Sequence, residues 1–85
     1  MSIFDAYNQE FSSLTSDISK NINDFRSDPS GEKASNIGRH LEALFVQASD
    51  LIKQMEVEVR SHDTATRKVL ADKVAGNHVI MSIHA

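Results

Sequence analysis

The stretch FDAYNQEFSSLTSDISKNI, residues 4–22, carries apolar side chains at alternating steps of three and four residues. The apolar positions are Phe4, Tyr7, Phe11, Leu14, Ile18 and Ile22. This spacing places all of them on one side of an α-helix, whereas a half-buried strand would alternate at every second residue. The intervening residues are mostly polar or charged, so the pattern predicts an amphipathic helix that buries one stripe against a neighbour.

Capping and breaking residues mark both ends of this first helix. The hydroxyl of Ser2 is placed to accept from the backbone N–H of Asp5, while the Asp5 carboxylate reaches back, an acidic variant of the capping box. At the other end Pro29 cannot continue a helix interior but suits the first turn of a new helix after Asp28. We therefore predict helices at about 2–26 and from 29 onward, antiparallel because the link between them is short.

The second helix, predicted at about 29–61, has a broader apolar band than the first. Its members are Ala34, Ile37, Leu41, Leu44, Phe45, Ala48, Leu51, Ile52, Met55 and Val59. A band this wide needs two neighbouring helices, so a third is expected. Gly38 is the weak point, costing about 1 kcal/mol relative to Ala unless close packing requires it.

The third helix is predicted at about 63–75, with a cap among Ser61, His62, Asp63 and Thr64 and a stop at residues 75–77. Residues 76–85 form a short β-branched run that does not continue the helical period, and we interpret them as a divergent tail outside the 1–74 domain. This short helix leaves apolar surface exposed, which predicts marginal stability or self-association.

The fold class predicted is therefore all-α, an antiparallel three-helix bundle with a truncated third helix. The predicted core consists of Phe4, Tyr7, Phe11, Leu14, Ile18, Ile22, Phe25, Ile37, Leu41, Leu44, Phe45, Ala48, Leu51, Ile52 and Met55.

Composition narrows the functional classes. The 85 residues include no cysteine, which excludes disulfides, thiolate nucleophiles and cysteine-ligated metals. The net charge of −3 comes from interspersed charges of both signs, so no nucleic-acid partner is expected. No apolar run is long enough for a signal peptide or a membrane span, and we expect a soluble, cytoplasmic chain.

The residue types that carry chemistry are not arranged for catalysis. His40, His62, His78 and His84 form no ligand pair four residues apart on a predicted helix, so we interpret them as solvated or capping residues. Glu56 and Glu58 lie two residues apart, on different faces of a helix. We expect no catalytic, cofactor or metal site, no cofactor and no enzyme activity; the binding residues stay unassigned.

Two stretches carry specific motifs: the order of Phe4, Tyr7, Phe11 and Leu14-Thr15, and the segment DLIKQMEVEVRS, residues 50–61, with Leu51, Met55, Glu56 and Glu58 in the motif positions. The first resembles the pattern that opens Vti-type v-SNARE proteins, and the second is similar to the end of the second helix in that family. The resemblance covers residues 1 to about 74.

The resemblance implies an N-terminal regulatory and sorting domain of a membrane-anchored SNARE. Such a domain acts in traffic among trans-Golgi, endosome and vacuole, on the cytosolic face of those membranes. It implies an epsin-related adaptor and, for the full-length family, syntaxin-type SNAREs as partners. Since residues 76–85 show neither SNARE heptads nor an anchor, we expect a domain fragment or a truncated product.

Two alternatives stay open. One is a structural helical hairpin that self-associates into a four-helix bundle and has no trafficking role. The other is a small enzyme or metal protein that uses His40 or His62.

Overall fold

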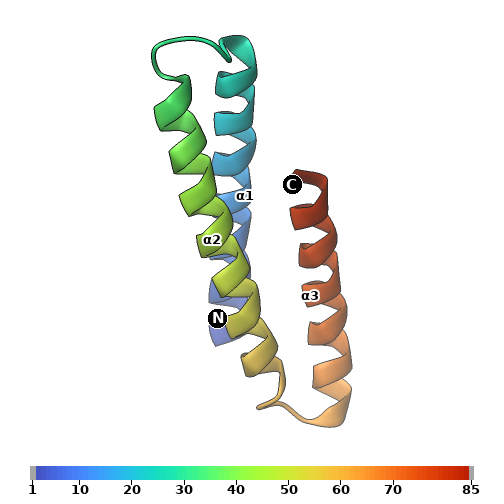
Figure 1. Cartoon of the computed structure of the whole chain (residues 1–85). Helices are drawn as coiled ribbons and strands as arrows, with labels where there is room; N and C mark the ends of the chain where they lie inside the picture. The colour runs from blue at the N-terminus through green and yellow to red at the C-terminus, as the bar shows by residue number, and fades with distance from the viewer. Residues whose placement is uncertain (1, 85) are drawn as a thin grey trace.

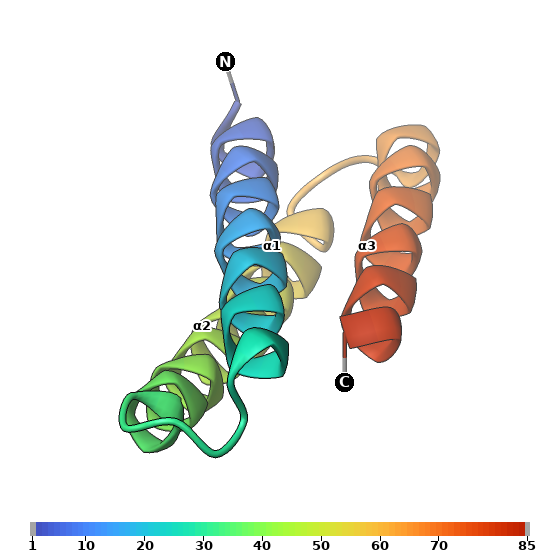
Figure 2. The same ribbon diagram turned by 90° about the horizontal axis from the view of Figure 1, so that it is seen from above.

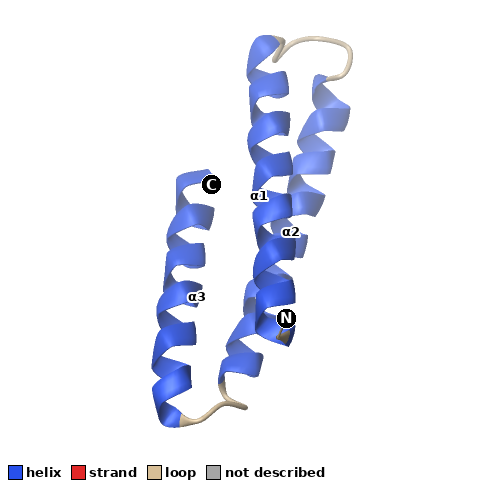
Figure 3. Cartoon of the chain, turned by 180° about the vertical axis from the view of Figure 1, so that it is seen from behind, coloured by secondary structure: helices blue, strands red, loops and turns tan. Residues whose placement is uncertain are grey.

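The computed structural model describes residues 2–84, which form three helices joined by two short links (Figure 1). Helix α1 spans Ile3–Ser27, α2 spans Ala34–Val59 and α3 spans Thr64–His84. Each helix runs antiparallel to the one before it (Figure 1). The described residues contain no strand (Figure 3), and the predicted all-α three-helix bundle is confirmed.

Helix α1 begins as its sequence predicts. The backbone N–H of Asp5 donates to Ser2 Oγ at 3.1 Å, and the Ser2 N–H lies 3.5 Å from Asp5 Oδ2. The capping box satisfies two backbone donors that the first turn of any helix leaves free. The helix therefore starts at a fixed point, with Phe4 already in the core.

The link between α1 and α2 differs from its prediction. The predicted start of the second helix at residue 29 is wrong, because α2 begins only at Ala34. Asp28 ends α1 instead of starting α2: its N–H donates to Phe25 O at 3.3 Å, and its carbonyl accepts from Gly31 N–H at 3.1 Å. A Cβ on residue 31 would meet only the carboxylate of Asp28, an exposed side chain that can rotate away, so the turn is held by these backbone hydrogen bonds and not by the glycine. Residues 28–33 reverse the direction of the chain between α1 and α2.

The second link is tighter. The predicted end of the second helix at residue 61 is also slightly too late, since α2 ends at Val59. The N–H groups of Arg60 and Ser61 donate to carbonyls three residues back, at 3.1 Å each, which tightens the chain into a turn.

The core lies where the apolar stripes of the three helices meet. Ten buried residues form one cluster: Phe4, Phe11, Ile18, Leu44, Ala48, Leu51, Ile52, Met55, Leu70 and Val74. Further predicted core residues pack against it while partly exposed, namely Tyr7, Leu14, Ile22, Leu41 and Phe45. Phe25 and Ile37 are only half-buried, because they lie near the α1–α2 link and α3 ends well short of it (Figure 1).

Helix α3 corrects the largest error of the sequence-based prediction. The predicted stop at residues 75–77 is wrong, because the helix continues through Gly76 to His84. Leu70, Val74, Asn77 and Met81 recur at steps of four and three and face the hairpin, and three of them are buried. This packing outweighs the poor intrinsic helix propensity of the tail.

Helix α3 packs chiefly against α2 and more sparsely against α1, as the end-on view shows (Figure 2). Its contact with α1 includes a polar pair: Asn77 Nδ2 donates to Asn8 Oδ1 at 3.2 Å and lies 3.6 Å from Met55 Sδ. Asn77 is the one buried polar residue found among the described residues. Nothing in the sequence pattern singled it out, since an Asn after Gly looked like a helix stop.

Candidate functional site: the groove between α2 and α3

A hollow of about 370 Å³ lies between the end of α2 and the middle of α3. Its lining residues are Glu56, Val59, Arg60, Ala71, Val74, Ala75 and His78. We call this hollow the α2–α3 groove. Its floor is apolar, and its charged residues stand on the rim.

The groove exists because small side chains occupy one face of α3. Ala71 and Ala75 are one helical turn apart, so they lie on the same side of α3 and project little from its backbone. Both are exposed, while Val74 beside them is buried in the core. The row of methyl groups leaves space that larger residues would fill.

A polar contact crosses the groove at its rim. His78 Nε2 on α3 lies 3.0 Å from Glu56 Oε1 on α2. The two side chains are 57% and 44% exposed, so water screens the pair and its contribution to stability is small. The pair defines one edge of the groove, and Arg60 adds a positive charge on the same rim.

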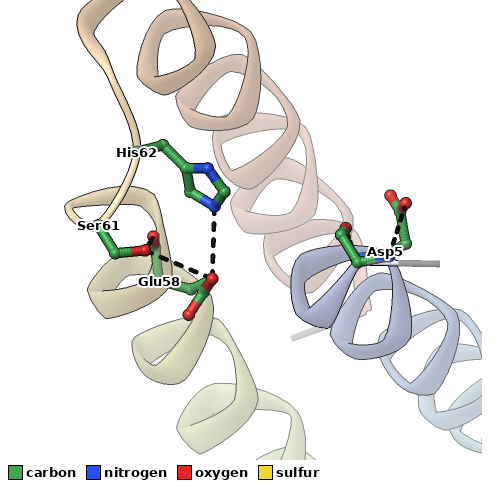
Figure 4. Close-up of polar contacts among 5 residues, drawn as sticks. Asp5, Glu58, Ser61 and His62 are labelled. Atoms are coloured by element: carbon green, nitrogen blue, oxygen red, sulfur yellow. Dashed lines mark hydrogen bonds and ion pairs between the residues drawn. The ribbon is translucent and has the colours of Figure 1, made fainter.

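The turn at the base of the groove is held by local polar contacts (Figure 4). Ser61 Oγ donates to the Glu58 carbonyl at 2.7 Å, and His62 Nε2 lies 3.3 Å from Glu58 Oε1. That nitrogen is shielded from solvent and has no hydrogen bond of good geometry. The His62–Glu58 contact is therefore a proximity of two polar groups within the turn and not a hydrogen bond.

Asp63 caps α3 and so sets where the groove begins. Its Oδ1 accepts from the backbone N–H of Thr66 at 2.8 Å. That hydrogen bond is the largest cause that holds the pKa of Asp63 below its ordinary value of 3.8, and a hydrogen bond from the Thr66 side chain is the next. The charges of the nearby His62 and Arg67 lower the pKa further. Of the four residues considered for this cap, Asp63 takes the role.

The four histidines are spread over the molecule. His40 is exposed on α2, and the 19 helical residues after His40, to the end of α2 at Val59, about 29 Å at 1.5 Å per residue, separate it from His62 in the turn. His78 faces α2, while His84 lines a different hollow together with residues of α1. Within residues 2–84, no three histidine or acidic side chains lie close enough to share a metal ion.

The carboxylates of Glu56 and Glu58 also point to different partners. Glu56 meets His78 on α3, and Glu58 meets His62 in the turn. The groove thus offers shape, an apolar floor and a rim with charges of both signs. Those properties suit the binding of a partner's side chains.

The sequence matches the family model described as vesicle transport v-SNARE protein N-terminus over residues 1–76. Comparison with curated proteins and with solved structures finds no match. No helix in the described part of the chain is long and apolar enough to cross a membrane.

Proposed function

This chain belongs to the vesicle transport v-SNARE N-terminus family, and we propose that it is the N-terminal regulatory and sorting domain of a Vti-type SNARE. The family places the chain in vesicle transport, where such domains act through protein contacts and not through catalysis. The transport step we propose is traffic among trans-Golgi, endosome and vacuole, on the cytosolic face of those membranes. We further propose that the family domain ends at residue 76, where the family match ends, and that the residues after it diverge in sequence although α3 continues through them.

The proposed partner of this domain is an epsin-related adaptor, and the α2–α3 groove is the surface we assign to it. The family match is the observation that carries the trafficking role. The groove supports the choice of surface, because its apolar floor at Val59, Ala71 and Ala75 is bordered by Arg60 and by the Glu56–His78 pair. A folded adaptor that inserts an apolar side chain and presents charges of both signs would match it.

Titration calorimetry with a purified epsin-related adaptor domain tests this proposal. Ala75→Arg puts a long charged side chain across the groove, and we expect it to weaken binding at least about tenfold, which corresponds to about 1.4 kcal/mol. The matched control is Ala43→Arg, on an exposed position of α2 that does not line the groove. Both variants must keep the helical circular dichroism of the natural chain.

Two results would contradict the proposal in different ways. If the natural chain binds no adaptor at millimolar concentration, the sorting role fails. If it binds and the two arginine variants bind equally well, the role stands and the assignment of the groove is wrong. Syntaxin-type SNAREs are proposed as partners of the full-length family protein and are not tested by this titration.

The alternative function, a helical hairpin that self-associates into a four-helix bundle, was based on apolar stripes that one chain leaves uncovered. The stripes of α1 and α2 are buried against each other and against α3 within one chain. No intermolecular bundle is needed to cover them.

A further inference from the structure

The outer face of α3 carries an apolar stripe that no other part of residues 2–84 covers. Its members recur at steps of four, seven and four residues, which places them on one side of the helix. They are Ala65, Val69, Gly76 and Ile80. The large side chains are well exposed: Val69 is 56% accessible and Ile80 39%. We call this set the α3 stripe, and it is separate from the α2–α3 groove.

The stripe is interrupted at one place by two neighbouring residues of opposite charge. Asp72 and Lys73 fill the gap between Val69 and Gly76, and both are exposed. Neither forms an ion pair within the described residues. An acid and a base side by side, in the middle of an apolar face, make a surface that is complementary to its own antiparallel copy.

We propose that a second copy of this chain docks on the α3 stripe, with the two α3 helices antiparallel and the two-fold axis passing between Asp72 and Lys73. In this arrangement Asp72 faces Lys73 of the second copy, and the same contact occurs twice because a two-fold interface repeats each contact. The two unpaired charges of each chain become two intermolecular pairs.

The apolar residues fall into matching places at the same register. Val69 comes opposite Gly76 of the second copy, and Ile80 comes opposite Ala65. A Cβ built on Gly76 meets nothing within 4 Å, so there is open space in which the valine can lie. Each large side chain thus meets a small one, which allows the two helix backbones to approach closely.

The charges of the α3 stripe also favour a second copy of this chain over an anionic membrane as the binding partner. Asp72 lies inside the stripe and would be repelled by acidic lipid headgroups. Two single helices bury less surface than a standard interface does, so the dimer is expected to be weak. This dimer does not depend on the trafficking role proposed above.

Sedimentation equilibrium from about 10 µM to about 1 mM, at low salt, tests the dimer. Asp72→Lys and Lys73→Asp each place like charges opposite one another twice, and we expect each variant alone to associate about tenfold more weakly. An equimolar mixture of the two variants restores both opposite-charge pairs. That mixture should regain the association of the natural chain.

An apolar variant supplies an independent check. Val69→Asp should weaken the dimer at least about tenfold, whereas Val57→Asp, at an equally exposed position of α2, should leave it unchanged. The proposal is overturned if the natural chain stays monomeric up to about 1 mM. It is equally overturned if the mixture of charge variants associates no better than each alone, or if Val57→Asp and Val69→Asp act alike.

Discussion

Replacing Met55 by Ala removes the side chain on which all three helices converge. Met55 is 0% exposed, belongs to the same cluster as Phe4 and Phe11 of α1, and its sulfur lies 3.6 Å from Asn77 Nδ2 of α3. Truncating a buried methionine to alanine costs about 2–5 kcal/mol, through lost burial and the cavity left behind. A chain of 85 residues has a total stability of about 4–13 kcal/mol, at 0.05–0.15 kcal/mol per residue. The variant should lose a large part of its free energy of unfolding.

Urea unfolding followed by far-ultraviolet circular dichroism measures this loss. Met55→Leu nearly conserves the volume and should cost less than about 1.5 kcal/mol. Val57→Ala, two residues away and 61% exposed, should change stability by no more than about 0.5 kcal/mol. If Met55→Ala unfolds at the same urea concentration as Val57→Ala, the convergence of three helices on this residue is refuted.

Three further changes probe single features of the bundle. Gly38→Ala should stabilise the chain by about 0.5–1 kcal/mol in the same urea assay, since its added Cβ meets nothing within 4 Å and alanine favours the helix; a destabilised variant would reveal packing around Gly38. A double-mutant cycle of Asn8→Ala and Asn77→Ala should yield a coupling energy of about 0.5–1.5 kcal/mol, and additive losses would mean that their hydrogen bond is absent in solution. The hydrogen bond from the Thr66 N–H lowers the pKa of Asp63, so this cap stabilises the fold above the ordinary pKa of 3.8, and the stabilisation is lost as the pH falls through the lower pKa of the folded state. In melts recorded from about pH 2 to 6, Asp63→Ala should therefore reduce the loss of melting temperature at acid pH. An unchanged loss would count against the cap.

The hairpin of α1 and α2 was predictable because its information is local. Regular steps of three and four residues identify both buried stripes, and the capping box at Ser2 and Asp5 marks the first helix to within one residue. The α1–α2 link was not predicted correctly, because Asp28 can serve either as a cap for the following helix or as the end of the preceding one. In the structure the Asp28 N–H donates to Phe25 O and the Asp28 carbonyl accepts from Gly31 N–H, and these turn contacts are visible only in three dimensions.

The end of α3 could not be predicted for a different reason. Gly76, Asn77 and the β-branched residues that follow favour a helix stop by intrinsic propensity, but Leu70, Val74 and Met81 hold this segment on the hairpin. The groove depends on the same segment, since His78 and Ala75 reach α2 only if the helix continues. A helix predicted to end at residue 75 therefore does not include His78, which forms part of the rim of the candidate site.

The candidate site requires α3 to lie against the hairpin as a continuous helix, and nuclear magnetic resonance tests this in one experiment. We expect a nuclear Overhauser contact between the Met55 methyl group and the side-chain amide of Asn77, together with slowed amide exchange through the predicted break at Gly76 to Met81. Amides of residues 76–81 that exchange at the rate of an unfolded chain, with no contact from Asn77 to Met55, would contradict the bundle and remove the groove on which the proposed function rests.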